Sequence, residues 1–183
     1  SFCLQPETLV HVVAGCQKYL DRFTWRHDSI LNFLAKTLSV LDECKLFVDL
    51  PGFESPSIVT GDEYRPDLLL LTSANHLYIV ELTVGFESNL TKNTKRKHAK
   101  YKNLTEKLTK NFTTVELISL SISSLGVFDK ECQSFVKMLS DLGLDKQRQH
   151  HCYRRMISIA IRATYYIFCR RNKEWENPEL MNI

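Results

Sequence analysis

The chain has 183 residues, of which 44% are hydrophobic and 25% charged, enough for one globular domain with a buried core. Its net charge of +3 is only mildly basic, so any case for nucleic-acid binding must rest on where the charges lie. Six scattered cysteines exclude a dense disulfide scaffold and favour a reduced, intracellular protein. The longest apolar run, 156–169, is too short for a bilayer span and contains Arg162, so we expect no membrane segment.

The predicted elements follow from apolar periodicity and turn residues. A helix is predicted over 24–41 with Thr24 as its N-cap, then a strand over 45–50 that stops at Pro51. The later elements are strands over 67–72 and 77–84, a helix over 87–110, a strand over 113–120, and helices over 130–142 and 145–171. The order α-β-β-β-α-β, followed by two helices, predicts an α/β fold.

The two central strands each carry one acid within an apolar pattern. If residues 73–75 form a three-residue loop with Asn75 in the left-handed conformation, Thr72 pairs with His76. Asp67 then lies directly opposite Glu81, and Thr83 follows on the same face.

Two opposed carboxylates in apolar surroundings repel each other unless a cation lies between them. Oxygen ligands favour Mg²⁺ or Mn²⁺, and such a site is a common means of hydrolysing a phosphodiester. A second interpretation stays open, because a two-residue loop would put Asp67 and Glu81 on opposite faces, as strand-end residues in solvent.

The helix predicted over 87–110 has one inward stripe that Lys97 interrupts, with Tyr101 one turn further on. Lys97 could neutralise charge on a phosphate with Tyr101 as a supporting donor, or its stem could pack while its ammonium reaches water. The rest of the helix is strongly basic, which fits either a solvated face or a DNA-binding surface. The candidate DNA contacts are Lys92, Lys95, Arg96, Lys100 and Lys102.

Together, R-P-D at 65–67, E-L-T at 81–83 and K-x-x-x-Y at 97–101 resemble the restriction-like endonuclease domain of site-specific non-LTR retrotransposons. That domain belongs to the PD-(D/E)XK superfamily and is most similar there to archaeal Holliday-junction resolvases. The resemblance implies a mixed sheet flanked by helices, with two further C-terminal helices here. It also implies that Asp67, Glu81 and the Leu82 carbonyl hold the metal. Thr83 stands where the superfamily has lysine, so Lys97 is its implied replacement and Lys100 the competing candidate.

Near the N-terminus, Cys3, His11 and Cys16 have the spacing C-x7-H-x4-C. The same retrotransposons place a C-x2-C-x7-H-x4-C zinc knuckle before the endonuclease, so the resemblance implies a Zn²⁺ site here that lacks its first cysteine. Buried thiols are the alternative. We therefore expect a knuckle remnant over 1–20 and the endonuclease over 21–183. His27 and Asp28, in the segment that follows, are candidates to reach the active site.

The sequence therefore predicts a Mg²⁺- or Mn²⁺-dependent DNA endonuclease. The resemblance implies nicking of target DNA to prime reverse transcription, a reverse transcriptase domain as partner, and a nuclear location. Two alternatives stay open: a catalytically silent DNA-binding module of the same fold, and a nuclease for branched DNA, which would act as a symmetric dimer.

Overall fold

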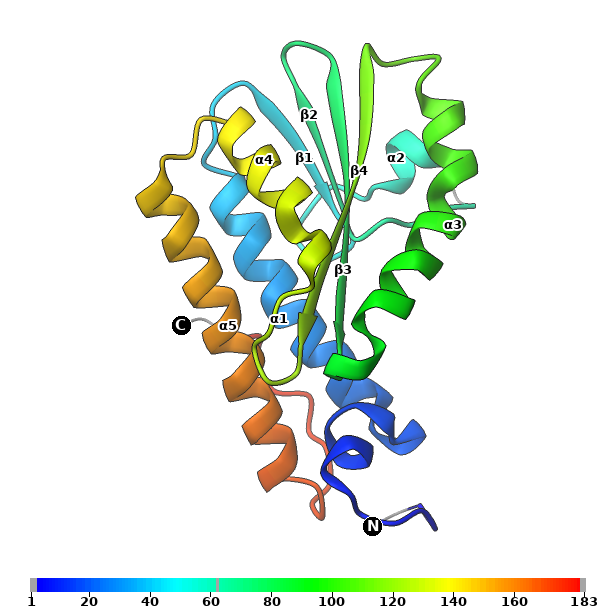
Figure 1. The fold of residues 1–183 in the computed structure, drawn as a ribbon, viewed down its shortest axis with the longest axis vertical. Helices are drawn as coiled ribbons and strands as arrows, with labels where there is room; N and C mark the ends of the chain where they lie inside the picture. Colours follow the sequence, from blue (N-terminus) through cyan, green and yellow to red (C-terminus); the bar gives the residue numbers. More distant parts are fainter. Residues whose placement is uncertain (1–2, 62, 182–183) are drawn as a thin grey trace.

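The computed structural model describes residues 3–61 and 63–181. Four strands form the sheet, and helices flank both of its faces (Figure 1). The strands are β1 (Cys44–Val48), β2 (Leu68–Thr72), β3 (His76–Gly85) and β4 (Thr114–Ser123). The α-helices are α1 (Leu20–Leu38), α2 (Ser57–Thr60), α3 (Leu90–Leu108), α4 (Gln133–Asp141) and α5 (Lys146–Cys169). This is the predicted α/β order, with the short α2 added.

The sheet is mixed, in the order β1-β2-β3-β4. β1 with β2 and β2 with β3 are antiparallel, whereas β3 and β4 are parallel because α3 connects them. The predicted hairpin register is confirmed, since Leu68 pairs with Val80 and Leu71 with Leu77. Asn75 has a φ of 58° and its amide donates to the Thr72 carbonyl, as the three-residue loop requires.

Each face of the sheet has its own core. On one face, α1, α4 and α5 pack against Leu68, Leu70 and Val80. On the other face, α3 packs against Leu69, Leu77 and Ile79 through Tyr101, Leu104 and Leu108. Because side chains alternate along a strand, Glu81 shares the α3 face with Leu77 and Ile79. The acid therefore lies on the side of the sheet that the basic helix covers.

The first helix begins earlier than predicted. Thr24 is not its N-cap, because α1 starts at Leu20 and places Thr24 in the second turn. The additional turn is stabilised by the end of α5: the Arg22 guanidinium donates to the Arg170 and Lys173 carbonyls, at 2.7 and 2.8 Å. The strand over 113–120 was likewise predicted too short, since β4 continues through buried Ser121 to Ser123.

The N-terminal segment packs onto the C-terminal end of α5. Val12, Val13, Cys16 and Tyr19 form a small buried cluster there. Arg26 on α1 is 1% exposed and joins this segment to α5, donating to the Val13 carbonyl at 2.8 Å and to Thr164 Oγ1 at 2.9 Å. Within the part of the chain that the structure describes, no helix is both long and apolar enough to cross a membrane.

Candidate active site

Asp67 and Glu81 lie side by side at one end of the β2–β3 hairpin. Asp67 immediately precedes β2, and continuing the register beyond Leu68 and Val80 puts it opposite Glu81. The Asp67 amide donates to Glu81 Oε1 at 3.3 Å, and the Leu82 amide donates to Asp67 Oδ2 at 2.8 Å. The Glu81 side chain is fully buried, and that of Asp67 is 16% exposed. The predicted juxtaposition of two carboxylates on one face is therefore present.

Lys97 is the cation that meets both acids. It lies on the inner side of α3, between buried Thr94 and buried Tyr101. Its ammonium forms a hydrogen-bonded ion pair with Glu81 Oε2 and lies 4.0 Å from Asp67 Oδ2. Lys100 instead donates to the Tyr101 hydroxyl at 2.9 Å. Of the two candidate lysines, Lys97 is therefore the one against the carboxylates.

His27 and Asp28 extend the site from the opposite layer. His27 Nε2 on α1 lies 3.4 Å from Asp67 Oδ2, and its Nδ1 lies 2.9 Å from Asp28 Oδ1. Asp28 thus orients the imidazole ring of His27, and the other nitrogen of that ring faces the Asp67 carboxylate. Of the two candidates, His27 contacts Asp67 directly, whereas Asp28 contacts His27.

Two further residues support the site, and neither was predicted. The Asp49 amide donates to the Asp67 carbonyl at 2.9 Å, which ties the end of β1 to the site, and the Asp49 carboxylate is ion-paired with Arg65. The Arg65 carbonyl accepts a hydrogen bond of 3.2 Å from the Tyr101 hydroxyl. The available signal for Asp49 was its position at the end of β1. That strand ends at the edge of the sheet where Asp67 precedes β2.

The pKa values reflect a crowded, buried charge cluster. Burial and the neighbouring Asp67 charge raise the pKa of Glu81, although Lys97 and Tyr101 act in the other direction. Burial alone would raise the pKa of Asp67, but the hydrogen bond and charge of His27 outweigh it, so this pKa is lowered. Burial would lower the pKa of His27, yet its bonds to Asp28 and Asp67 raise it to about 10. Burial, then Glu81, raises the pKa of Tyr101. Asp67 is thus held ionised, and Glu81 is the carboxylate whose charge costs most.

The predicted DNA-contacting side chains are exposed along α3, which also carries Lys97; they are Lys92, Lys95, Arg96, Lys100 and Lys102. Thr83 lies two residues beyond Glu81 on β3 and is half-buried. The carboxylate pair therefore lies on the face of the sheet that α3 covers, and the same helix carries the exposed cations.

Cys3, His11 and Cys16 converge into a separate cluster. Cys3 Sγ lies 2.9 Å from His11 Nε2 and 3.6 Å from Cys16 Sγ, and all three ligand atoms lie within 4.8 Å of one another. Two sulfurs and one imidazole suit Zn²⁺. Over residues 3–61 and 63–181, this is the one group of three or more His, Cys, Asp or Glu side chains that is so compact. Burial raises the pKa of the Cys16 thiol.

No family model matches the chain, and no curated protein does so. Among solved structures, the chain is similar to one described as "Structure and function of phenuiviridae cap snatching endonucleases", with 19% sequence identity and a TM-score of 0.41. The similarity covers 68% of this chain and 66% of that chain. A likeness at this level carries no argument about fold or function, so function must be argued from the site itself.

Proposed function

We propose that this protein is a divalent-metal-dependent DNA endonuclease with a PD-(D/E)XK core. The observation that carries the proposal is the convergence of Asp67, Glu81 and Lys97 at one end of the β2–β3 hairpin. Two acids and one lysine, brought together from the start of β2, from β3 and from α3, form a combination that serves phosphodiester hydrolysis.

The side chains fit a divalent cation. Glu81 is a fully buried carboxylate whose pKa is raised by burial and by Asp67, so the pair needs positive charge between its members. Lys97 supplies one such charge. The donors are carboxylate oxygens, to which the Leu82 carbonyl would add a third, and such ligands suit Mg²⁺ or Mn²⁺. When bound, the metal would activate water and act as a Lewis acid toward the scissile phosphate.

Each residue of the site then has a distinct role. Asp67 and Glu81 hold the cation, and His27 keeps Asp67 ionised and oriented by contacting Oδ2. Lys97 adds positive charge beside the phosphate in the transition state, and Tyr101 supports it from the next turn of α3. The exposed lysines and arginine of α3 contact DNA phosphates, which position the duplex without specifying its sequence.

We extend the proposal to the biological setting that the sequence motifs imply. The motifs fit a nicking domain from a site-specific retrotransposon polyprotein, which would act in the nucleus beside a reverse transcriptase domain. The Cys3, His11 and Cys16 cluster would supply three ligands to Zn²⁺ as part of a knuckle.

Nicking of supercoiled plasmid tests the proposed function. The purified protein is incubated with Mg²⁺, Mn²⁺ or EDTA, beside Asp67→Asn, which keeps the side-chain shape. We expect open-circular product only with a metal and only from the wild type.

Wild-type and Asp67→Asn proteins that nick equally would contradict the assignment of the site. A folded wild type that binds duplex DNA and leaves the plasmid intact with either metal would instead select the silent DNA-binding alternative. A branched-DNA nuclease would cut four-way junctions in preference to the plasmid and would sediment as a dimer.

A further inference from the structure

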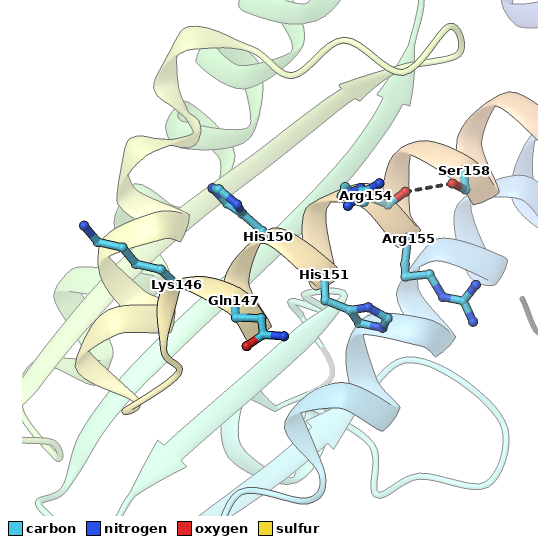
Figure 2. Close-up of a pocket in the computed structure, with 7 residues that line it drawn as sticks. All are labelled: Lys146, Gln147, His150, His151, Arg154, Arg155 and Ser158. Atoms are coloured by element: carbon cyan, nitrogen blue, oxygen red, sulfur yellow. Dashed lines mark hydrogen bonds between the residues drawn. The ribbon is translucent and has the colours of Figure 1, made fainter.

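The first half of α5 carries a second basic surface, remote from the carboxylates. This helix has 24 residues and contains no aspartate or glutamate. Its exposed or half-buried side chains Lys146, Gln147, His150, His151, Arg154, Arg155 and Ser158 line one surface hollow (Figure 2). We call this set the α5 basic surface.

The cations of this surface have no close counter-ion in the described part of the chain. An ordinary protein surface mixes both signs of charge, so that neighbouring side chains neutralise one another. Among the described residues, Lys146, Arg154 and Arg155 form no ion pair, and Arg148 contacts Asp145 only at the edge of the hollow, at 3.8 Å. The Arg155 Nε atom is buried and has no hydrogen-bond partner among these residues. A concentration of unpaired positive charge is the electrostatic signature of a polyanion site.

The donors follow the helix in two parallel rows. Lys146, His150 and Arg154 recur every four residues and form one row, and Gln147, His151 and Arg155 form the other. The first and last residues of each row are eight positions apart, which corresponds to about 12 Å along the helix axis at about 1.5 Å per residue. Figure 2 shows the two rows projecting from different sides of the same helical segment. A single phosphate ion would engage one end only, whereas an extended chain of phosphates would engage the whole length.

The composition of the hollow distinguishes nucleic acid from protein as the partner. Protein interfaces bind largely through buried aromatic and aliphatic anchors, which need apolar pockets. All seven lining residues are basic or polar, and none is apolar. Arginine forks and lysine ammonium groups are instead the usual partners of phosphodiester oxygens. The chemistry therefore favours a nucleic-acid backbone over an acidic polypeptide.

The surface is separate from the one proposed for cleavage. α5 packs with α1 and α4 on one face of the sheet, and α3 covers the other. Figure 1 shows α3 and α5 on opposite sides of the molecule. The two helices therefore present two distinct positive surfaces.

We propose that the α5 basic surface is a second nucleic-acid-binding site that holds the phosphodiester backbone of a segment other than the one at Asp67. This site recognises phosphate rather than base edges, so it binds nucleic acid of any base sequence. It does not depend on cleavage, and a protein that never cut DNA would still possess it.

Salt-dependent binding tests the proposal. Fluorescence anisotropy is recorded in EDTA with labelled 30-mers of duplex DNA, duplex RNA and single-stranded RNA, between about 50 and 200 mM salt. The test variant is Lys146→Gln/Arg154→Gln, whose two side chains are exposed. The matched control is Arg162→Gln/Lys173→Gln, which removes two exposed charges outside the hollow. Both variants should keep the wild-type melting temperature to within about 2 °C.

We expect the test variant to make the plot of log affinity against log salt shallower by about two, because each lost phosphate contact reduces the slope by about one. The control should change it by less than half as much. The polymer that gives the largest difference identifies the segment as DNA or RNA. Equal slopes for the test and control variants with all three polymers would overturn the proposal, whatever the result of the nicking assay.

Discussion

Lys97 should stabilise the fold as well as serve the reaction, and replacing it tests the geometry of the site without any substrate. Lys97→Met keeps the apolar stem and removes the ammonium group. The variant leaves Glu81, which is fully buried, and Asp67, which is 16% exposed, without their shared cation. Removing one partner of a buried ion pair costs about 3 to 5 kcal/mol, because the remaining charge is uncompensated.

The structure indicates that the cost of Lys97→Met lies at the lower end of this range. The Lys97 side chain is 20% exposed, so water screens part of the interaction. Glu81 can also take up a proton, since burial and Asp67 already raise its pKa. We therefore expect Lys97→Met to lose about 3 kcal/mol of unfolding free energy. For a chain of this size, that loss lowers the melting temperature by about 6 to 12 °C.

Urea unfolding in EDTA at pH 7.5 measures the effect, with Lys100→Met as the matched control. Lys100 is exposed and interacts with Tyr101 instead of the acids, so its replacement should cost at most about 1 kcal/mol. In Glu81→Gln, the loss caused by Lys97→Met should be clearly smaller, because only the Asp67 carboxylate, 4.0 Å away, still faces the ammonium group. Equal losses for Lys97→Met and Lys100→Met, or an undiminished loss in Glu81→Gln, would refute the reasoning.

Three other predictions concern the rest of the molecule. His27→Ala should slow metal-dependent nicking by at least about tenfold, because residues that hydrogen-bond to metal ligands typically contribute about 10- to 100-fold. Unchanged nicking would remove His27 from the catalytic site. The wild type should retain about one Zn²⁺ per chain by metal analysis and Cys16→Ala should lose it; equal zinc contents would assign the cluster to buried thiols. Asn75→Val should cost about 1 to 2 kcal/mol in urea unfolding, because its φ is 58°, and Asn75→Gly should cost less; the reverse order would contradict the loop geometry.

The features that could be predicted from sequence are those set by neighbours along the chain. Asn75 tolerates the left-handed conformation, and the flanking strands alternate between two apolar faces, so the register of the hairpin follows from local rules. Because that register places Asp67 opposite Glu81, the pairing of the two carboxylates could be predicted as well. Lys97 could be placed because helical periodicity alone puts it between Thr94 and Tyr101 on the inner face of α3.

The features that were missed depend on contacts between distant segments. The early start of α1 rests on Arg22, whose guanidinium binds carbonyls at the end of α5 about 150 positions away. The extension of β4 places Ser121 in the core, where Thr94 Oγ1 lies 2.9 Å from its hydroxyl. A serine in a strand gives no signal of burial until its partner is known.

The same limitation applied to the outer parts of the site. Sequence made His27 a candidate, but its contact with Asp67 depends on how α1 crosses the end of the sheet. Asp49 joined the site only when β1 was paired with β2, since its amide bonds to the Asp67 carbonyl. Tertiary packing, rather than local pattern, therefore decides which acids surround the central pair.

Direct binding of Mn²⁺ tests the central claim that Asp67 and Glu81 hold a divalent cation. Electron paramagnetic resonance counts free Mn²⁺ as protein is titrated in, for the wild type, Glu81→Gln and the control Glu116→Gln, an acid on β4 that pairs with His76 and Lys137. We predict that the wild type and Glu116→Gln bind Mn²⁺ with the same affinity and that Glu81→Gln binds it at least about tenfold more weakly. Equal binding by all three proteins would contradict the account.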